Sequence, residues 1–203
     1  MTQPHPFGPS AADTSAPRRT APSGPVAGSP ARSAPATTSP NAPRHRRVAT
    51  ALGEYVFAAE GEGITGLWRA RQSHYPRPER LGRPASPDDL LLTRAEEQLL
   101  AYLGGERENF ALPLAPRGTP FQHAVWDRLR EIPRGSTTTY GRIAHDLGRP
   151  RAAQAVGAAV GSNPISIVVP CHRVLGTSGA ITGYAGGTET KQALLVLEGA
   201  LPA

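Results

Sequence analysis

The first apolar pattern along the chain predicts a β-hairpin. Residues 55–57 and 64–68 are short runs rich in apolar, β-branched and aromatic side chains, a composition that favours extended strands. Gly61 and Gly63 lie between the two runs, where a tight turn needs residues that tolerate unusual backbone angles. We therefore expect two strands joined at these glycines.

Helical periodicity follows the hairpin. Thr93 and Glu96 have the spacing of a capping box, which predicts a helix start, and Gly104 is placed to end that helix. Its apolar face would consist of three leucines: Leu99, Leu100 and Leu103. No residues up to position 115 form a convincing catalytic set, so we expect this half of the chain to act as a scaffold.

A longer helical pattern begins at residue 119. Thr119 and Pro120 suit the cap and first turn of a helix. Apolar side chains then recur every four residues, at Phe121, Val125 and Leu129. This spacing places all three on one buried face.

Two shorter helices are expected next. The first has three apolar positions: Ile143, Ala144 and Leu147. Gly148 would end it, and Pro150 would open the second, whose body over residues 152–161 is almost entirely small side chains. Two helices joined by a short turn, with arginines at the entrance to the second, are typical of a DNA-binding helix–turn–helix. The small side chains would permit either close approach to a DNA groove or tight packing inside the protein.

The last apolar run leads to the only cysteine of the chain. Residues 165–169 predict a buried strand that Pro170 would stop directly before Cys171 and His172. A thiolate rather than a thiol attacks carbon, and a free thiol with a pKa of about 8.5 is only slightly ionised at neutral pH, so a base is required. An inert packed cysteine is the other interpretation. The polar pair His172 and Arg173 is unusual at the edge of a core and favours a nucleophile beside its base.

Residues 1–47 differ from the rest in composition. They are mainly Pro, Ala, Ser and Thr with scattered Arg, and such a segment cannot bury enough apolar surface to offset its ordering entropy. We expect a disordered tail, which either is passive or adds nonspecific affinity for DNA.

The net charge of +6 is unevenly distributed. Residues 1–47 carry six arginines and one aspartate, and residues 117–203 carry nine basic and five acidic side chains. Residues 48–116 carry seven basic and ten acidic side chains. The basic surplus on the tail and on the half with the cysteine favours a polyanion as partner.

The composition also indicates in which cellular compartment the protein is expected. No apolar stretch is long enough to span a membrane, and the proline-rich start lacks the apolar core of a secretory signal. One cysteine cannot form an internal disulfide, which fits a reducing compartment. We expect a cytoplasmic protein that associates with the nucleoid when it binds DNA.

Residues 167–174, Ile-Val-Val-Pro-Cys-His-Arg-Val, resemble the active-site motif of the O6-alkylguanine-DNA alkyltransferases, also called methylated-DNA–protein-cysteine methyltransferases. Further segments match that family in order and spacing: 121–126, 132–135, 139–141, 155–157, 162–164 and 183–187. The resemblance is strong over residues 116–199, weaker over 48–115 and absent before that.

The resemblance implies an α/β (α+β) fold in three parts. Residues 1–47 would be the tail and residues 48–115 a small ribonuclease-H-like scaffold domain. Residues 116–203 would form a winged helix–turn–helix domain that binds DNA and carries the methyltransferase activity.

The implied reaction is DNA repair by direct alkyl transfer. Cys171 would take a methyl or other alkyl group from O6 of guanine, or from O4 of thymine, in double-stranded DNA. The resulting thioether has no good leaving group, so each molecule would act once, and a monomer suffices. His172 would be the base, acting through a water molecule, and Glu198 the carboxylate that orients it. No cofactor is needed, and the zinc site that some relatives build from Cys and His has no cysteine left here, so we expect no metal.

Further residues match family roles. Tyr140 would donate a proton or a hydrogen bond to the leaving guanine, although a tyrosine at a helix start can also simply pack. Asn163 would brace the turn before the active-site strand. The base would be flipped into a pocket with Tyr184 in its wall and with backbone contacts from Val174 and Ala185.

The recognition helix contains one departure from the family. Gln154 stands where the family usually has an arginine that fills the gap left by the flipped base, so we expect weaker engagement of DNA. Arg151 would either compensate for that loss or contact a phosphate. Arg173 is grouped with these DNA contacts.

Three alternative functions stay open. A noncatalytic lesion sensor would bind the damage without accepting the alkyl group, but retention of Cys171 argues against it. A winged-helix regulator would need base-reading side chains, which the small-residue helix lacks. A thiol hydrolase would need turnover and an oxyanion site, which the sequence does not reveal.

Overall fold

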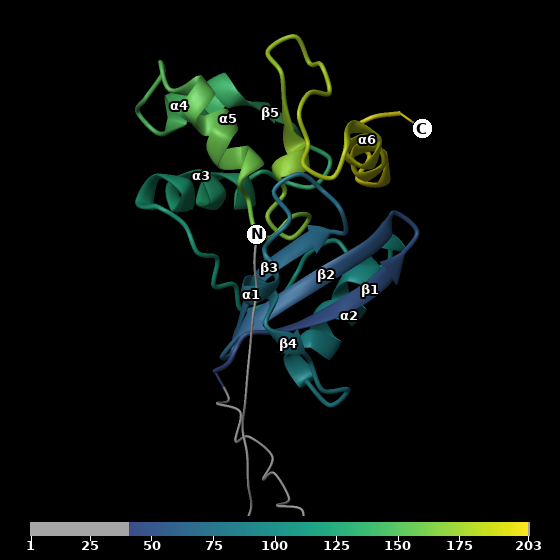
Figure 1. Cartoon of the computed structure of the whole chain (residues 1–203). Coiled ribbons are helices and arrows are strands. Elements are labelled where there is room, and N and C mark those ends of the chain that lie inside the picture. Colours follow the sequence, from purple (N-terminus) through teal and green to yellow (C-terminus); the bar gives the residue numbers. More distant parts are fainter. Residues whose placement is uncertain (1–40, 203) are drawn as a thin grey trace, which may run out of the picture. The chain divides into compact units, whose positions relative to one another are not determined.

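The computed structural model describes residues 41–202, in which a sheet with two helices precedes a mainly helical C-terminal half (Figure 1). The sheet half contains β1 (Arg44–Thr50), β2 (Gly53–Glu60), β3 (Gly63–Arg69), α1 (Pro78–Leu81), β4 (Arg83–Pro84) and α2 (Leu90–Leu103). The C-terminal half contains α3 (Pro120–Arg130), β5 (Thr138–Thr139), α4 (Tyr140–Asp146), α5 (Ala153–Gly161), the 3₁₀ helix η1 (Cys171–Arg173), β6 (Val174–Leu175) and α6 (Thr188–Leu197). The mixed α/β class is confirmed, and residues 1–40 of the expected tail lie outside the described residues.

The sheet has the strand order β3-β2-β1-β4. Strands β1, β2 and β3 pair antiparallel, whereas the short β4 pairs parallel with β1. The predicted hairpin is confirmed, because β2 and β3 pair with Phe57 opposite Leu67, and Gly61 in the turn has a φ of 56°.

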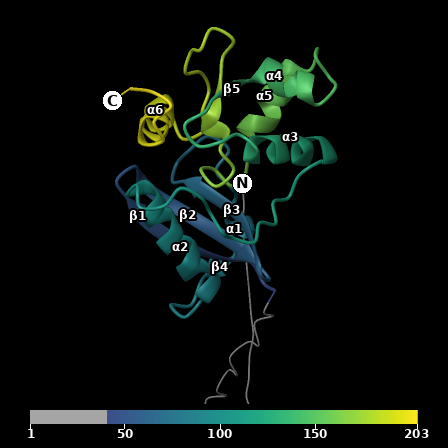
Figure 2. The same cartoon turned by 180° about the vertical axis from the view of Figure 1, so that it is seen from behind.

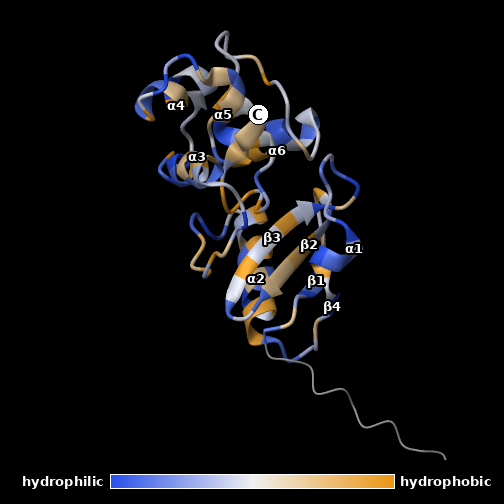
Figure 3. Cartoon of the chain, turned by 60° about the vertical axis from the view of Figure 1, so that its left-hand side comes forward, coloured by the Kyte–Doolittle hydropathy of each residue, from blue (hydrophilic) through white to orange (hydrophobic). Residues whose placement is uncertain are grey.

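Strand β2 is buried on both faces. Side chains alternate along a strand, so Tyr55 and Phe57 face the main core with α2, while Val56 faces a smaller cluster with Trp68 and Leu81. Figure 2 shows α2 across one face of the sheet, and Figure 3 shows hydrophobic colour along β2 and on parts of β3. Two-sided burial explains why β2 is continuously apolar rather than alternating.

Strand β1 begins at Arg44, so the folded part starts before residue 48, where the sequence placed its boundary. The arginines that gave this segment the composition of a tail have acidic partners in the sheet half. Arg44 pairs with Asp89, Arg46 with Glu96 at 3.4 Å, and Arg47 with Glu54 at 2.6 Å. These partners lie beyond residue 53 in the sequence, so local composition could not reveal them.

Helix α2 starts three residues before the predicted capping box. Its cap is Asp89, whose carboxylate accepts a hydrogen bond from the Leu92 N–H at 3.0 Å. The Thr93 hydroxyl instead accepts from Arg46 at 2.7 Å. The end at Gly104 is confirmed, but Leu100 is 44% exposed and does not belong to the buried face.

Helix α3 has the predicted cap. Thr119 and Gln122 form a capping box, and Val125 and Leu129 are buried, although Phe121 is only partly buried. The interpretation of Pro150 as a helix start is wrong. A turn closed by the Ala152 N–H and the Arg149 carbonyl (2.8 Å) precedes α5, and proline suits the second position of such a turn.

Candidate active site

The segment that leads to Cys171 is a series of turns, not the predicted strand. Ile167 has a φ of 69°, and the Val168 N–H donates to the Ser166 carbonyl at 2.8 Å, which defines a γ-turn. A second such bond, from the Cys171 N–H to the Val169 carbonyl at 2.8 Å, encloses Pro170. The apolar run is buried as a strand would be, but positive φ at a β-branched residue is strained and requires strong support from its surroundings.

Asn163 and strand β3 supply that support. The Asn163 amide donates to the Val169 carbonyl at 2.8 Å and accepts from the Ile165 N–H at 3.0 Å. On the other side, the Leu67 N–H donates to the Pro164 carbonyl at 2.8 Å, and the Leu67 carbonyl accepts from the Ser166 N–H at 3.0 Å. Asn163 thus bonds to the backbone on both sides of the turn that it was expected to brace, and the segment after that turn differs from the expectation in being turns rather than a strand.

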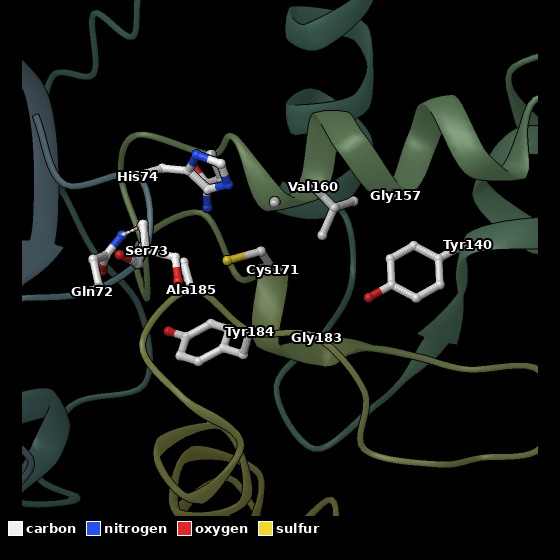
Figure 4. A pocket seen from close by; sticks show the side chains of 13 residues that line it. Gln72, Ser73, His74, Tyr140, Gly157, Val160, Cys171, Gly183, Tyr184 and Ala185 are labelled. Atoms are coloured by element: carbon white, nitrogen blue, oxygen red, sulfur yellow. Dashed lines mark hydrogen bonds between the residues drawn. The ribbon is translucent and has the colours of Figure 1, made fainter.

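Cys171 lies at a cavity of about 280 Å³ (Figure 4). Five of the predicted site residues line it: Tyr140, Asn163, Cys171, Tyr184 and Ala185. The sheet half contributes residues 72–74 to the same wall, and the Ser73 N–H donates to the Ala185 carbonyl at 3.1 Å. The pocket therefore draws on α4, α5, η1, the loop before α6 and the loop after β3.

A buried polar network lies next to the thiol. His172 is fully buried, and its Nε2 lies 2.5 Å from Glu198 Oε1. Because an ionised carboxylate only accepts, Nε2 carries the hydrogen and Nδ1 is left as the acceptor. The Arg173 Nε donates to Glu198 Oε2 at 2.8 Å, and the Tyr102 hydroxyl donates to Oε1. Nδ1 of His172 has no hydrogen-bond partner among the described residues.

Burial and hydrogen bonding set the protonation states of this group. Burial raises the pKa of the Cys171 thiol, and it outweighs the opposing hydrogen bond from Asn163 and the charge of Lys191. Burial also lowers the pKa of His172 despite the opposing effect of Glu198. Burial alone would raise the pKa of Glu198, but hydrogen bonds from His172 and Arg173 lower it to about 2. At neutral pH the site thus holds a protonated thiol, a neutral imidazole and a carboxylate.

Tyr140 begins α4 and lines the pocket. Burial raises the pKa of its hydroxyl, with a hydrogen bond from the Thr182 side chain acting in the opposite direction. The phenol therefore stays protonated at neutral pH and can act as a hydrogen-bond donor.

Two predicted contacts have other partners in the structure. Arg173 was grouped with the DNA contacts, but it is buried, and its guanidinium binds Glu198 and, at 2.5 Å, the Ile132 carbonyl. That assignment is wrong, because the guanidinium neutralises an internal carboxylate. The Val174 carbonyl accepts from Lys191 Nζ at 2.5 Å and so retains one lone pair for another donor.

Gln154 and Arg151 lie apart from the pocket wall. Both are exposed, Arg151 in the turn before α5 and Gln154 on that helix. Gly157, one turn further along α5, does line the pocket. The helix thus connects the cavity to the exposed surface where these two side chains lie.

Sequence reasoning missed two buried residues of the site. Neither Tyr102, near the end of α2, nor Lys191, on α6, was singled out from the sequence. Lys191 is fully buried, and its ammonium group also donates to the Thr182 carbonyl at 2.9 Å. No local signal identifies Tyr102, whereas Lys191 follows the matched segment 183–187 closely enough to have been noticed.

No three His, Cys, Asp or Glu side chains among residues 41–202 come together as they would around a metal ion. Within the same range, no helix is long and apolar enough to cross a membrane.

Comparison with known proteins identifies the family. A family model described as "6-O-methylguanine DNA methyltransferase, DNA binding domain" matches residues 120–200. The chain is 44% identical over 154 residues to the methylated-DNA–protein-cysteine methyltransferase of Mycobacterium tuberculosis, covering 76% of this chain and 91% of that protein. It is 43% identical over 152 residues to the inducible methylated-DNA–protein-cysteine methyltransferase of Bacillus subtilis, covering 74% of this chain and 82% of that protein.

A solved structure supports the same family assignment. The crystal structure of Mycobacterium tuberculosis OGT in complex with DNA matches with a TM-score of 0.71 at 43% identity, covering 77% of this chain and 93% of that one. The resemblance that the sequence motifs indicated is confirmed over more than the C-terminal half. With its motif cysteine at a pocket and its histidine bound to a buried carboxylate, this chain belongs to the methylated-DNA–protein-cysteine methyltransferase family.

Proposed function

We propose that this chain repairs DNA by moving an alkyl group from O6 of guanine to the sulfur of Cys171. One observation carries the proposal: Cys171 lines a pocket, and the adjacent His172 is bound to an ionised Glu198. A protonated thiol beside a neutral, oriented imidazole is a resting state from which the base can generate the thiolate that attacks a saturated carbon.

The step balances within these groups. His172 Nδ1 takes the thiol proton through one water molecule, and the sulfur attacks the alkyl carbon. The S–C bond forms as the C–O6 bond breaks, and its electron pair stays on the guanine. Tyr140 donates a hydrogen bond to that guanine, since its raised pKa keeps the hydroxyl protonated and it lines the pocket. If the proton itself passes to the guanine, the thiol proton held by His172 neutralises the tyrosinate through solvent. The thioether has no leaving group, so one molecule repairs one base.

The base must leave the helical stack to reach the sulfur, because O6 is not accessible to a thiolate inside a duplex. We assign Tyr184 to the wall of the base pocket, and the backbone of Ala185 and the remaining lone pair of the Val174 carbonyl to contacts with the guanine. The exposed Arg151 and Gln154 would face the duplex. O4 of thymine carries the same kind of substituent and is a second candidate substrate. The reaction needs one copy of the chain, and we place it in the cytoplasm.

Mass spectrometry tests the proposal. The protein is incubated with a duplex that contains one O6-methylguanine, and intact and peptide masses are measured beside those of Cys171→Ala. We expect one methyl group per molecule, on the peptide with Cys171, and none in the variant. Binding of the lesion without a mass gain would identify a lesion sensor instead.

A further inference from the structure

Glu198 receives a hydrogen bond from the other half of the chain. Tyr102 lies near the end of α2 in the sheet half, it is 1% exposed, and its hydroxyl donates to Glu198 Oε1. The same oxygen accepts from His172 Nε2 at 2.5 Å and from Arg173 Nη2 at 3.2 Å. Tyrosine and histidine therefore share one acceptor atom.

The geometry around Tyr102 fixes that hydroxyl. Its ring packs against Phe110 with the ring centroids 4.8 Å apart, and Arg173 Nη2 approaches its oxygen at 3.5 Å. Burial first, and the bond to Glu198 second, raise the pKa of the hydroxyl, so it remains protonated and a donor at neutral pH.

We infer that Tyr102 is a positioning residue of the proton relay, supplied by the sheet half to the active site of the C-terminal half. This inference rests on the proposed function, because it assumes that His172 receives the proton of Cys171. By donating to Oε1, the phenol holds the carboxylate in place and draws off part of its negative charge. The carboxylate then orients the imidazole without stabilising its protonated form so strongly that the base is charged before the reaction.

The other groups around the relay do not duplicate this effect. Besides their effect on each other, His172 and Glu198 interact with the charged or titratable side chains of Arg173, Lys191, Tyr102 and Tyr184. Arg173 and Lys191 are cations in the C-terminal half and stay in place when Tyr102 is changed. Tyr102 is the neutral hydroxyl donor on Glu198 within residues 41–202, and its removal takes away that bond together with the longer one from Arg173 Nη2 at 3.5 Å.

Single-turnover kinetics of Tyr102→Phe test the inference. The rate of methyl transfer from a duplex with one O6-methylguanine is measured from roughly pH 5 to pH 9, a range that spans histidine titration. At neutral pH we expect a rate about tenfold below that of the wild type, the usual effect of losing a hydrogen bond to a charged group. In the plot of rate against pH, the rate falls at low pH as His172 becomes protonated, and we call this part of the plot the acid limb. We expect its midpoint to move up by roughly half a pH unit in the variant, because the less neutralised carboxylate favours protonated His172. Affinity for the lesion duplex should not change.

Two control variants separate positioning from stability. Tyr55→Phe removes the same atom from another fully buried tyrosine of the sheet half, whose hydroxyl has no hydrogen-bond partner among the described residues. Leu99→Ala weakens the buried face of α2 without touching Glu198. Neither control should move the acid limb, even where it lowers the melting temperature.

The outcomes are distinct. A wild-type protein that transfers no methyl group would overturn the proposed function itself. A wild type that transfers the group, with Tyr102→Phe matching it in rate and in acid limb, would overturn the role of Tyr102 alone. An acid limb that moves equally in Leu99→Ala and in Tyr102→Phe would reduce that role to ordinary packing.

Discussion

The two sides of Cys171 differ in construction. The pocket side is an open cavity of about 280 Å³ lined by tyrosines, glycines and short loops. The other side is a closed network in which His172 is fully buried and Glu198 is 6% exposed. The shape and contacts of the pocket side determine which substrate binds. The network side must keep His172 neutral and Glu198 ionised for the reaction to start. We therefore expect substitutions on the pocket side to change binding and substitutions in the network to change rate and pH dependence.

The largest effect should come from Cys171, which belongs to both sides. Cys171→Ala should abolish alkyl transfer, because no other cysteine is present in the chain, and leave lesion binding nearly intact. Transfer is followed with a labelled methyl group and binding by fluorescence anisotropy. Residual labelling of the variant would show that another residue accepts the group.

His172→Ala should separate the two sides most clearly. We expect the transfer rate at neutral pH to fall by about 10² to 10⁴, the range for losing a general base, while the dissociation constant for the lesion duplex stays constant. The remaining rate should rise with pH, since the raised pKa of Cys171 keeps its thiol protonated until alkaline conditions ionise it. A rate that is independent of pH in the variant would contradict the role of His172 as base.

Glu198 should make the network side sensitive to acid. Its pKa of about 2 in the folded chain lies below the ordinary 4.5, so its contribution to stability is complete above pH 4.5 and is lost as the pH falls toward 2. The contribution is on the order of 3 kcal/mol by linkage. Denaturant unfolding of Glu198→Gln at several pH values should show lower stability at neutral pH and a flatter acid dependence. An unchanged acid profile would exclude an ionised carboxylate at this position.

The smallest effect is expected at the exposed surface of α5. Gln154→Arg should tighten binding to a lesion duplex about fivefold. The slope of log affinity against log salt concentration should become steeper by about one, as expected for one additional phosphate contact. The transfer rate at saturating DNA should stay the same, because Gln154 does not line the pocket. Gln154→Lys serves as a control, because lysine adds the positive charge without the planar guanidinium group of arginine. Equal affinity of Gln154→Arg and the wild type would show that the exposed glutamine is not at the DNA interface.

Sequence patterns predicted the pocket side better than the network side. The motif around Cys171 and the loop with Tyr184 are contiguous segments, and the structure brings both to one cavity. The pairing of His172 with Glu198 came only from family resemblance. Tyr102 was missed because its partner is 96 residues away, and a tyrosine near the end of an amphipathic helix has an ordinary packing explanation.

The errors in the fold have the same origin. Residues 165–169 are buried like a strand, but Asn163 and Leu67 impose turns through hydrogen bonds that hydropathy does not encode. Arg44 marks a strand rather than a tail because Asp89 lies next to it in the fold. Asn163 is close in the sequence, and Leu67 and Asp89 are distant, but all three act through polar contacts that apolar periodicity does not encode. That periodicity correctly located β2, β3 and α3.

The pairing of Leu67 with Pro164 and Ser166 constrains how the chain can change over generations. A one-residue insertion or deletion in β3 would move the side chains beyond it to the opposite face and, when it precedes Leu67, displace the backbone groups on which the active-site turns rest. Substitutions in the two halves can accumulate separately except where side chains meet across them, as Tyr102 meets Glu198, but changes of length in β3 are not tolerated in this way. A chimera that joins the sheet half of one relative to the C-terminal half of another should keep its reactive thiol only where that register is inherited intact.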